Sequence, residues 1–481
     1  MQRDARGRLL WQVVEQGSDR GAGCEMTLSL DMRIQYVVER ELREAVIEAE
    51  ALSGSVVVMN PLTGELLAMA SMPAYNPNRF HAYRADYWRN RSITDTFEPG
   101  STIKAVLLAA ALEEGIVNEE SPFYCEKGRF RYGGHQIHDM TSHETLTVRE
   151  ILISSSNIGV TKIADKLAAP SLWKYLDLFG FGQKTGVDLP GEQAGVLRPW
   201  EKWSKVALAT HAFGQGFSVT ALKMASCFGV FANGGFVVEP YIVKEIRDEN
   251  GRLVKRASPK VIRRAISKNT ADRVRAVLED VVQEGSGREA GLPGYRVAGK
   301  TGTAQKFDHE TGEYSNSRLV VSFVGIVPAD KPEMVIAVVI NEPSGKVTGG
   351  TLAAPVFRNI AASALYYRHV PEYVPLIDEA ADSVRLCDAK TMEQHKPLSE
   401  IKVESTGQPG QWKMPELRRL PLRTAFRILD GLPIKVRLEG SGRIVRQLPE
   451  AGQFIQAGQT LILTASPDGI EKTSERSRQH G

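Results

Sequence analysis

Long apolar stretches are missing from this sequence. None of its 481 residues lies in a run that approaches the roughly 18–20 apolar residues needed to span a bilayer. The N-terminus, Met-Gln-Arg-Asp-Ala-Arg-Gly-Arg, is polar and is not followed by the apolar core of a signal peptide. The chain as given is therefore expected to be soluble and to contain no transmembrane segment.

Cysteine is also scarce, and its spacing excludes two common uses. Cys24, Cys125, Cys227 and Cys387 lie far apart and form no Cys-x-x-Cys pair. Neither a zinc knuckle nor a dense disulfide framework is indicated, so free structural thiols are expected.

Motifs for metals, cofactors and phosphates are weak. His135-x-x-His138-Asp139 offers two histidines and an acid, but no third metal ligand is evident. Gly214-Gln-Gly216 lacks the long spacing and the Lys-Ser/Thr ending of a phosphate loop. No metal and no cofactor are therefore expected. A formal net charge of only +3 points to no particular partner, and no nucleic-acid partner is expected.

The composition is that of an ordinary globular protein, with 42% hydrophobic and 24% charged residues, enough for a large core in roughly three domains. The apolar spacing after Asp31 predicts a core-packing helix within residues 26–49. Strand-like sequence is found in five places, namely residues 55–59, residues 65–70, a run from Tyr295 through Lys300, residues 319–327 and residues 334–340.

These strands predict one antiparallel sheet, with the first two as a hairpin and the last three as a meander. Residues 349–367 would close the domain as a helix over that sheet, despite Pro355 near its start. Residues 95–298 are mostly helical in pattern, which gives an α+β domain with a helical lobe facing one side of the sheet.

The candidate active residues begin with Ser101-x-x-Lys104. Pro99 and Gly100 break the preceding structure, the Ala/Leu run that follows favours a helix, and Gly115 is a C-terminal stop. Ser101 would therefore lie at a helix N-terminus, where unpaired N–H groups favour negative charge on a nucleophilic oxygen. Lys104 is one turn further on and could take the serine proton, if burial or a second cation lowered its pKa by about 3 from the usual value near 10.4.

That pair alone is a weak signal, because an N-cap serine followed by a surface lysine is common. Two further motifs strengthen it. Ser155-Ser156-Asn157 follows a helical pattern over residues 148–153, and Lys300-Thr301-Gly302-Thr303 lies in a strand-like run. In isolation these would be a loop cap and a solvated strand end. The order Ser-x-x-Lys, Ser-x-Asn, Lys-Thr-Gly is the signature set of serine penicillin-recognising enzymes.

Four segments extend these motifs, and they read Phe97-Glu-Pro-Gly-Ser-Thr-Ile-Lys104, Ser155-Ser-Asn157-Ile-Gly-Val, Phe213-Gly-Gln-Gly216 and Gly299-Lys-Thr-Gly-Thr-Ala-Gln305. With them, residues 26–368 resemble the transpeptidase domain of class B penicillin-binding proteins. Among these the chain is most similar to the division-specific peptidoglycan D,D-transpeptidases and their sporulation relatives. The resemblance implies the penicillin-binding-protein/β-lactamase-like α+β fold, an antiparallel sheet with a helical lobe and an active site between them.

The resemblance also implies a role for each motif residue. Ser101 would attack the carbonyl of the penultimate D-alanine of a stem peptide, releasing the terminal D-alanine, and Lys104 would take the serine proton. Ser155 would relay a proton toward the leaving amine, and Asn157 would hold Lys104 and the substrate amide.

The third motif would bind the substrate. Its terminal carboxylate would be received by the side chains of Lys300, Thr301 and Thr303. Lys300 would also be the second cation that lowers the pKa of Lys104. Gly302, which lacks a Cβ, would let the substrate approach the strand edge and pair with it. The backbone N–H groups of Ser101 and Thr303 would form the oxyanion hole.

These roles lead to the expected function, a serine-type peptidoglycan D,D-transpeptidase. It would cross-link stem peptides through an acyl-enzyme during septal cell-wall synthesis and be inhibited covalently by β-lactams. Two alternatives stay open. One is a hydrolase, either a D,D-carboxypeptidase or a β-lactamase, although no Glu-x-x-Leu-Asn segment follows Asn157 as in class A β-lactamases. The other is a non-turnover β-lactam sensor, although no membrane signalling segment is present.

The composition shifts after Arg368. Residues 369–410 contain several prolines and scattered acids and are expected to be a linker. The polar tail, residues 468–481, is expected to be disordered.

Between them, residues 411–467 resemble a PASTA domain, a helix packed on a three-stranded sheet. The expected helix covers residues 422–429, and the expected strands cover residues 434–438, 443–448 and 460–464. The segment is basic. In the family such modules are linked to muropeptide binding or to packing on the catalytic domain, and a solvated basic face is an equal alternative here.

Residues 1–25 would be a lead-in, the remnant of a missing head region. Division transpeptidases carry a transmembrane anchor and an elongated head before the catalytic domain, and this sequence starts just before that domain. The resemblance implies a place in the cell envelope, on the periplasmic or extracytoplasmic side of the inner membrane. The implied partners are stem peptides ending in D-alanyl-D-alanine, β-lactams, and a division glycosyltransferase with other divisome proteins.

Overall fold

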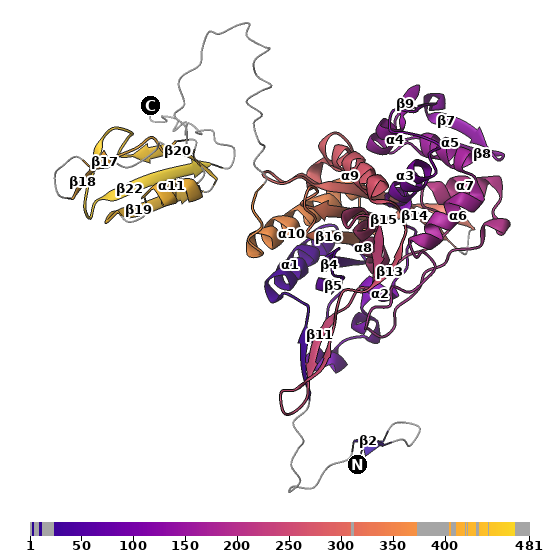
Figure 1. Cartoon of the computed structure of the whole chain (residues 1–481), viewed down its shortest axis with the longest axis horizontal. Coiled ribbons are helices and arrows are strands. Elements are labelled where there is room, and N and C mark those ends of the chain that lie inside the picture. The colour runs from indigo at the N-terminus through magenta and orange to yellow at the C-terminus, as the bar shows by residue number, and fades with distance from the viewer. Residues whose placement is uncertain are drawn as a thin grey trace, which may run out of the picture. The chain divides into compact units, whose positions relative to one another are not determined.

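The computed structural model describes residues 2–3, 9–11, 24–308, 312–372, 404–405, 410–418, 420, 422–429, 432–440 and 442–466. The chain divides into two compact units, Met1–Pro375 and Leu376–Gly481 (Figure 1). The expected boundaries at residues 25, 368, 410 and 467 stay predictions. Most of the expected linker and all of the expected disordered tail lie outside the described residues.

The first unit is built on a five-stranded antiparallel sheet with the strand order β14-β15-β16-β4-β5. Its strands are β4 (Ser53–Met59), β5 (Leu66–Met72), β14 (Ala298–Asp308), β15 (Glu313–Val327) and β16 (Met334–Asn341). The expected hairpin and meander are both confirmed, except that the strand with Lys300 begins at Ala298 rather than near Tyr295. In register, Lys300 pairs with Val324 on β15. In the strand order, the strand with Lys300 is one edge of the sheet.

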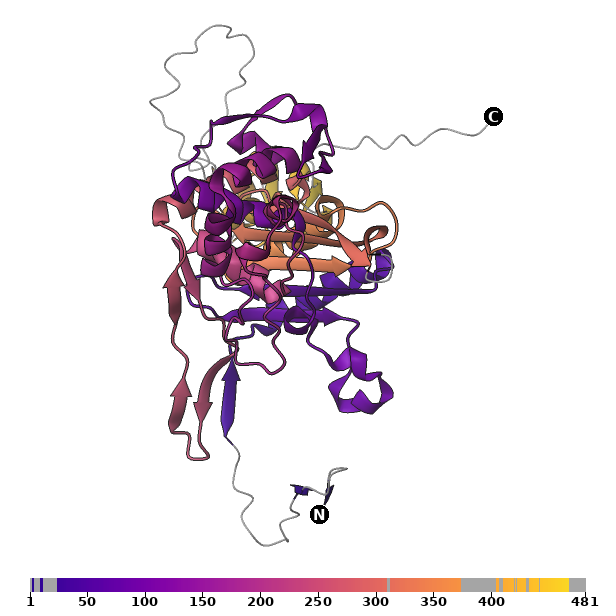
Figure 2. The ribbon, with the colours of Figure 1, turned by 90° about the vertical axis from the view of Figure 1, so that its right-hand side faces the viewer.

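Helices cover both faces of this sheet (Figures 1 and 2). Helices α1 (Met32–Glu48) and α10 (Ala354–Tyr367) pack on one face, and α8 (Ala221–Ala232) belongs to the lobe on the other. Strand residues alternate between the two faces. On β4, Val56 and Val58 belong to the core with α1 and α10, whereas Val57 belongs to the core of the lobe. The sheet is thus the middle of three layers.

The two helices on the outer face begin as their sequences predict. The side chain of Asp31 accepts hydrogen bonds from the backbone N–H groups of Arg33 and Ile34, so it caps α1. In α10, Pro355 lies in the first turn, where a missing N–H group leaves no helical hydrogen bond unmade. A single wider turn, η7 (Gly349–Ala353), precedes α10. Both expected helices are confirmed.

The remaining α-helices described in the first unit belong to the lobe. They are α2 (Arg91–Thr94), α3 (Lys104–Glu113), α4 (Val148–Ser154), α5 (Asn157–Leu167), α6 (Ala169–Leu178), α7 (Lys205–Ala212) and α9 (Lys268–Gln283). Short 3-10 turns are η1 (Pro77–Ala82), η2 (Ala85–Trp88), η3 (Gly100–Ile103), η4 (Glu126–Gly128), η5 (Trp200–Lys202) and η6 (Arg288–Ala290). Helix is the commonest regular structure in residues 95–298, but it covers fewer than half of them and eight short strands lie among the helices, so the expectation of mostly helical sequence is only partly confirmed.

Several small sheets were not expected from the sequence. Their strands are β1 (Gln2–Arg3), β2 (Leu9–Trp11), β3 (Glu25–Leu28), β6 (Pro122–Tyr124), β7 (Arg129–Tyr132), β8 (His135–His138), β9 (Thr145–Thr147), β10 (Phe236–Val238), β11 (Val243–Arg247), β12 (Leu253–Arg256) and β13 (Val261–Arg264). They pair as β1 with β2, β6 with β9, β7 with β8, β10 with β13, and β12-β11-β3. Each strand has at most five residues, too few for a clear alternating pattern.

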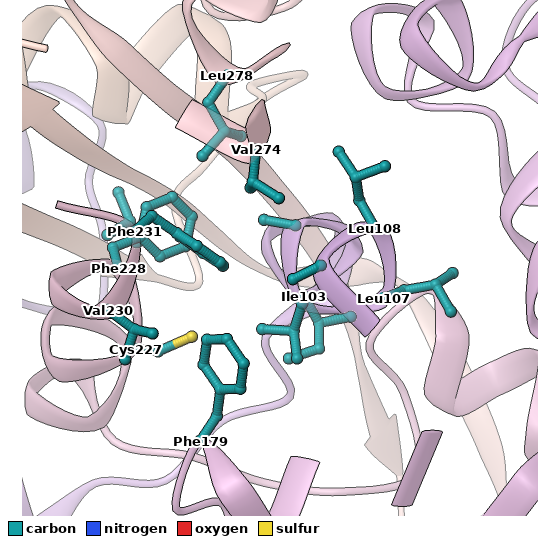
Figure 3. Close-up of a cluster of buried hydrophobic side chains, with 14 of the residues drawn as sticks. Ile103, Leu107, Leu108, Phe179, Cys227, Phe228, Val230, Phe231, Val274 and Leu278 are labelled. Carbon is teal, nitrogen blue, oxygen red and sulfur yellow. The ribbon is translucent and has the colours of Figure 1, made fainter. Parts of the chain in front are cut away.

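Helix α3 runs through the middle of the lobe core. Every residue from Lys104 to Leu112 is at most 4% exposed. Figure 3 shows part of the surrounding cluster, with Phe228 and Phe231 from α8 and Val274 from α9. The helix ends at Glu113, and Gly115, the expected stop, follows its C-cap with a positive φ of 66°. A lysine at the first position of such a helix must be buried with it.

The second unit contains the helix and the three strands expected for it. Helix α11 (Leu422–Leu429) accompanies a sheet with the order β19-β22-β20, formed by β19 (Lys435–Gly440), β20 (Arg443–Leu448) and β22 (Thr460–Ser466). A second small sheet was not expected and is formed by β17 (Glu404–Ser405), β18 (Gln411–Lys413) and β21 (Phe454–Gln456). The identity of this unit as a PASTA domain stays a prediction.

Two composition-based expectations can be compared with the described part of the chain. None of its helices is long and apolar enough to cross a lipid bilayer. Cys24, Cys125 and Cys227 are free thiols, the last two buried, and Cys387 lies outside the described residues.

The packing of α1 against the sheet predicts unequal effects of two identical substitutions. Ile34 is 0% exposed and Ile47 is 64% exposed, on the same helix. We expect Ile34→Ala to lower the free energy of unfolding by about 2–5 kcal/mol, because it leaves a cavity in a packed core. Ile47→Ala should change it by less than about 0.5 kcal/mol. Urea unfolding measures both, and equal losses would contradict the assigned burial.

Candidate active site

Ser101 lies on a tight turn that another turn holds in place. Gly100 has a φ of +56° and its N–H donates to the carbonyl oxygen of Gly214 at 2.9 Å. A Cβ on Gly214 would lie 2.0 Å from the carbonyl oxygen of Gly100, so only glycine fits there. The expected helix N-terminus is displaced, since the 3-10 turn η3 carries Ser101 and α3 begins at Lys104. Such turns are frequent at helix starts.

Ser155 and Asn157 lie where α4 ends and α5 begins. Ser155 ends α4 in the left-handed region, with φ 58° and ψ 39°, which is uncommon for a residue other than glycine. Ser156 caps α5 and Asn157 is its first residue. A strained backbone of this kind persists only where its surroundings enforce it, and it is typical of functional positions.

The amine of Lys104 reaches this junction. Its Nζ lies 2.6 Å from the carbonyl oxygen of Ser155, 2.8 Å from Oδ1 of Asn157 and 3.2 Å from Oγ of Ser155. The Ser101 hydroxyl forms no hydrogen bond within the described part of the chain. Catalytic hydrogen bonds are often completed only when a substrate binds.

Lys300 approaches the same hydroxyl from the sheet. Its Nζ lies 3.1 Å from Oγ of Ser155 and 3.5 Å from the carbonyl oxygen of Thr301. Two lysines from opposite sides of the site, both 0% exposed, therefore share one serine hydroxyl. The structure brings together the three sequence motifs in this way.

This burial changes the charge of both amines. The pKa of Lys104 lies well below its ordinary value, first because burial penalises the ammonium form and second because Lys300 is close, with Asp139 opposing the shift. Burial lowers the pKa of Lys300 to about 7. Either burial or a second cation was expected to lower the pKa of Lys104, and both causes are present.

A neutral Lys104 matches its surroundings. A neutral amine has two N–H donors, which suit the carbonyl oxygens of Ser155 and Asn157, and one lone pair. That lone pair can accept a proton from a hydroxyl, either that of Ser155 at 3.2 Å or one brought within reach. The site can thus move a proton between a serine oxygen and Lys104, with the Ser155 hydroxyl as the link to Lys300.

Gly302 has a second reason for lacking a side chain, in addition to the expected approach of the substrate, which stays a prediction. A Cβ there would lie 2.4 Å from Oγ of Ser322, 2.9 Å from the carbonyl oxygen of Pro99 and 3.1 Å from a methyl carbon of Thr102. The missing side chain therefore leaves room for the turn with Ser101 to pack on β14. The close approach is between two parts of this chain.

The two threonines of the third motif have different surroundings. The hydroxyl of Thr301 lies 2.6 Å from that of Ser286, whereas Thr303 is exposed and its hydroxyl accepts a hydrogen bond from the N–H of Gly349 at 3.1 Å. A Cβ on Gly100 would lie 3.5 Å from the carbonyl carbon of Thr303. The turn with Ser101 therefore lies directly against Thr303. The backbone N–H groups of these two residues are the ones expected to form the oxyanion hole.

Asp139 is a site residue that the sequence analysis considered only as a metal ligand. Its carboxylate accepts hydrogen bonds from the backbone N–H groups of Asn157 at 2.5 Å and Ile158 at 3.1 Å, and from the hydroxyl of Ser156 at 2.6 Å. It caps α5 from outside the helix. Because it lies 18 positions before Asn157, no local sequence pattern signals this contact.

His135 and His138 lie on β8, directly before Asp139. The carbonyl oxygen of His138 accepts a hydrogen bond from the side-chain amide of Asn157 at 3.1 Å. Across the described residues, no group of three or more His, Cys, Asp or Glu side chains is placed to hold a metal ion.

Glu98 is a second residue of the site that the sequence did not single out. Its Oε1 accepts hydrogen bonds from the N–H of Gly216 at 2.8 Å and from the hydroxyl of Tyr314 at 3.1 Å. Burial raises its pKa. The carboxylate thus joins the turn with Ser101 to the turn of residues 213–216 and to strand β15.

Comparisons with known proteins give one family. The family model described as the penicillin-binding protein transpeptidase domain matches residues 54–362. The stage V sporulation protein D of Bacillus subtilis is 35% identical over 463 residues, which are 95% of this chain and 68% of that protein. The peptidoglycan D,D-transpeptidase FtsI of Escherichia coli is 36% identical over 366 residues, which are 76% of this chain and 60% of that protein.

A solved structure shows the same fold. Penicillin-binding protein 3 of Mycobacterium tuberculosis in complex with aztreonam matches with a TM-score of 0.69 and 34% identity, over 75% of this chain and 83% of that chain. The alignment with the Bacillus protein covers more of this chain than its first compact unit, so it extends into the second.

The contacts of Asp139 predict an order of stability. Asp139→Ala removes three acceptor contacts and should lower the free energy of unfolding by about 1–3 kcal/mol. Asp139→Asn keeps one side-chain oxygen for the N–H groups of Asn157 and Ile158 and should lose less. Urea unfolding ranks the three proteins, and equal losses for the two variants would show that the carboxylate oxygens do not cap α5.

Proposed function

The chain belongs to the penicillin-binding-protein transpeptidase family, and from the geometry of its site we propose that it is a peptidoglycan D,D-transpeptidase. It would cross-link stem peptides through an acyl-enzyme on Ser101 and would be inhibited covalently by β-lactams. The observation that carries the proposal is the shared contact of two buried lysines, Lys104 and Lys300, with the hydroxyl of Ser155. A purely structural serine gives no reason to bury two amines.

The first chemical step is attack by Ser101. Lys104 has the lowered pKa that a base near neutrality needs, and it begins the helix that directly follows the turn with Ser101. As Ser101 Oγ bonds to the carbonyl carbon of the penultimate D-alanine, its proton passes to Lys104. The oxyanion that forms would be stabilised by the backbone N–H groups of Ser101 and Thr303, each worth about 3–4 kcal/mol of transition-state energy.

The leaving group is the amine of the terminal D-alanine, and it must gain a proton as the C–N bond breaks. Ser155 supports this transfer, since its hydroxyl contacts both Lys104 and Lys300 and can give a proton while taking one. Asn157 holds Lys104 through Oδ1 and would receive the substrate amide. In the second step an amine of another stem peptide would attack the acyl-enzyme by the reverse sequence.

Substrate binding is supported by the position of β14. It is an edge strand, so in the described part of the chain no other strand pairs with residues 300–303 on the side away from β15, and an extended peptide could add there. The terminal carboxylate would lie near Lys300 and the hydroxyls of Thr301 and Thr303. A bound carboxylate favours the ammonium form of Lys300, whose pKa of about 7 leaves it partly neutral without substrate.

The proposal extends to the setting of the enzyme. Action on peptidoglycan requires a place in the cell envelope, on the periplasmic or extracytoplasmic side of the inner membrane. A division glycosyltransferase and other divisome proteins would be the protein partners. This part is supported by resemblance to the relatives and by no contact within the chain.

The first test is covalent labelling by penicillin. Intact-mass spectrometry with excess penicillin, followed over hours, should show one stable adduct on the wild-type chain and none on Ser101→Ala. Ser344→Ala, an exposed serine outside the site, is the matched control and should label normally. Normal labelling of Ser101→Ala would remove the assigned nucleophile.

The fate of the adduct separates the alternatives. Rapid return to the unmodified mass with hydrolysed drug would indicate a β-lactamase. A stable adduct must be followed by incubation with a stem peptide and an amine acceptor, where a cross-linked product supports the transpeptidase. Release of D-alanine without cross-linking would indicate a carboxypeptidase, and no turnover at all would indicate a sensor.

The lowered pKa of Lys300 predicts a pH dependence of acylation. In the free enzyme Lys300 is charged below about pH 7 and neutral above it, so the carboxylate-binding charge is lost as pH rises through this value. We expect the second-order rate constant of penicillin acylation to increase with pH in the acidic range, because Lys104 loses its proton there. Above about pH 7 the rate constant should decrease, because Lys300 loses its charge. The profile should be bell-shaped.

Lys300→Arg tests the falling limb. An arginine stays charged at every accessible pH, so this variant should acylate more slowly and lack the decline above about pH 7. Stopped-flow acylation with a fluorescent penicillin over a pH series measures both profiles. An unchanged falling limb in the variant would assign the decline to another group.

A further inference from the structure

An aromatic segment projects from the first unit after β5, the strand at the sheet edge opposite to β14. Residues 73–90 leave the sheet after β5 and return through α2, and they form the small lobe below the body in Figure 2. No residue of this segment is buried. Five of its eighteen residues are aromatic, against 7% in the whole chain. We call it the aromatic lobe.

The rings of the aromatic lobe pack on one another rather than into a core. Phe80 and Trp88 meet edge to face with centroids 5.5 Å apart, and they stay 51% and 43% exposed. Tyr83 meets Tyr75 at 6.3 Å and Tyr87 at 6.2 Å. Stability of the fold does not require so much apolar surface in water, and exposed clusters of this kind mark interaction sites.

The charges of the aromatic lobe favour an anionic partner. Arg91 binds Asp86 and Asp95, each at 2.8 Å, and Arg89 pairs with the same two acids. Asp86 and Asp95 are therefore already paired with arginines of the chain. Arg79 and Arg84 are exposed and form no ion pair within the described part of the chain, although Asp86 is close enough to Arg91 and also to Arg84 that both help lower the pKa of its carboxyl. Each is next in sequence to a ring residue, Arg79 to Phe80 and Arg84 to Tyr83, and guanidinium groups suit carboxylates.

From this combination we infer that the aromatic lobe binds a glycan strand of peptidoglycan, with rings stacked on sugar faces and arginines on the carboxylates of the attached peptides. The inference rests on the proposed function for the identity of the polymer. Standard protein interfaces take roughly 20–30 residues from each partner, more than this lobe of eighteen residues offers. A slender polymer fits its size better than a protein surface does.

The position of the aromatic lobe in the fold would allow it to hold the polymer at a second point, away from the catalytic site. It follows β5, at the edge of the sheet opposite to β14 and Lys300. A polymer held there while its peptide occupies the catalytic site is bound at two points. The second contact then raises the effective concentration of peptides near Ser101 without adding any contact in the site itself.

The test is co-sedimentation with peptidoglycan sacculi stripped of attached proteins, using the full chain already acylated by penicillin so that the catalytic site is filled. Phe80→Ala with Trp88→Ala should weaken binding by about tenfold. Arg79→Ala with Arg84→Ala should weaken it at low salt and flatten its salt dependence. Tyr366→Ala and Arg252→Ala, an exposed ring and an exposed arginine elsewhere, are matched controls and should bind as the wild type does.

Unchanged binding of both double variants would overturn the inference, and that result is also expected if the lobe recognises a protein. Competition for sacculus binding shows whether the lobe recognises the sugars or the peptides of peptidoglycan. Oligomers of N-acetylglucosamine should compete, whereas competition by a sugar-free stem peptide alone would overturn the glycan assignment. Penicillin labelling within about twofold of wild type shows that the variants are folded. Because sacculus binding does not need Ser101 chemistry, its failure is distinct from failure of the proposed transpeptidase.

Discussion

The burial of two amines around the hydroxyl of Ser155 is the constraint on which the rest of this structure depends. A charged lysine is costly to remove from water, and two of them within reach of one oxygen repel each other. Both costs are reduced only if at least one amine loses its proton. The lobe and the sheet must therefore close over Lys104 and Lys300 with full hydrogen bonding, which the carbonyl oxygens of Ser155 and Thr301 and the amide of Asn157 help to provide.

This closure is made possible by small residues at the contact between turn and strand. Gly214 lets Gly100 approach, and Gly302 lets Pro99 and Thr102 approach. A side chain at Gly214 or Gly302 would force the turn with Ser101 away from a neighbour that holds it. The glycines and the lysines thus serve one arrangement, in which Ser101, the proposed nucleophile, is partly exposed while Lys104 and Lys300 are buried.

Much of this could be predicted from the sequence, and the part that could not has a physical reason. The spacing of apolar residues and the turn residues between them predict α1, the hairpin of β4 and β5, and the meander. These elements are long enough for the spacing of their apolar residues to be recognised. The three motifs locate the site. Asp139 and Glu98 were missed because each acts through a contact with a segment distant in sequence. The packing reason for Gly302 was missed because its neighbour, Pro99, belongs to another part of the chain. The small strands of the lobe were missed because they are too short to show a period.

The spacing of the site along the chain has a consequence for how the molecule folds. Lys104 meets Asn157 across 53 positions, and Lys300 meets Ser155 across 145. Contacts between such distant segments form late, because the entropy of closing long loops must be overcome first. A folding intermediate with a finished lobe and an undocked β14 would hold Ser101, Lys104 and Asn157 and still lack the second amine. Reactivity toward penicillin would then appear only with the last docking event, so the reagent that inhibits this family is also a probe of whether its fold is complete.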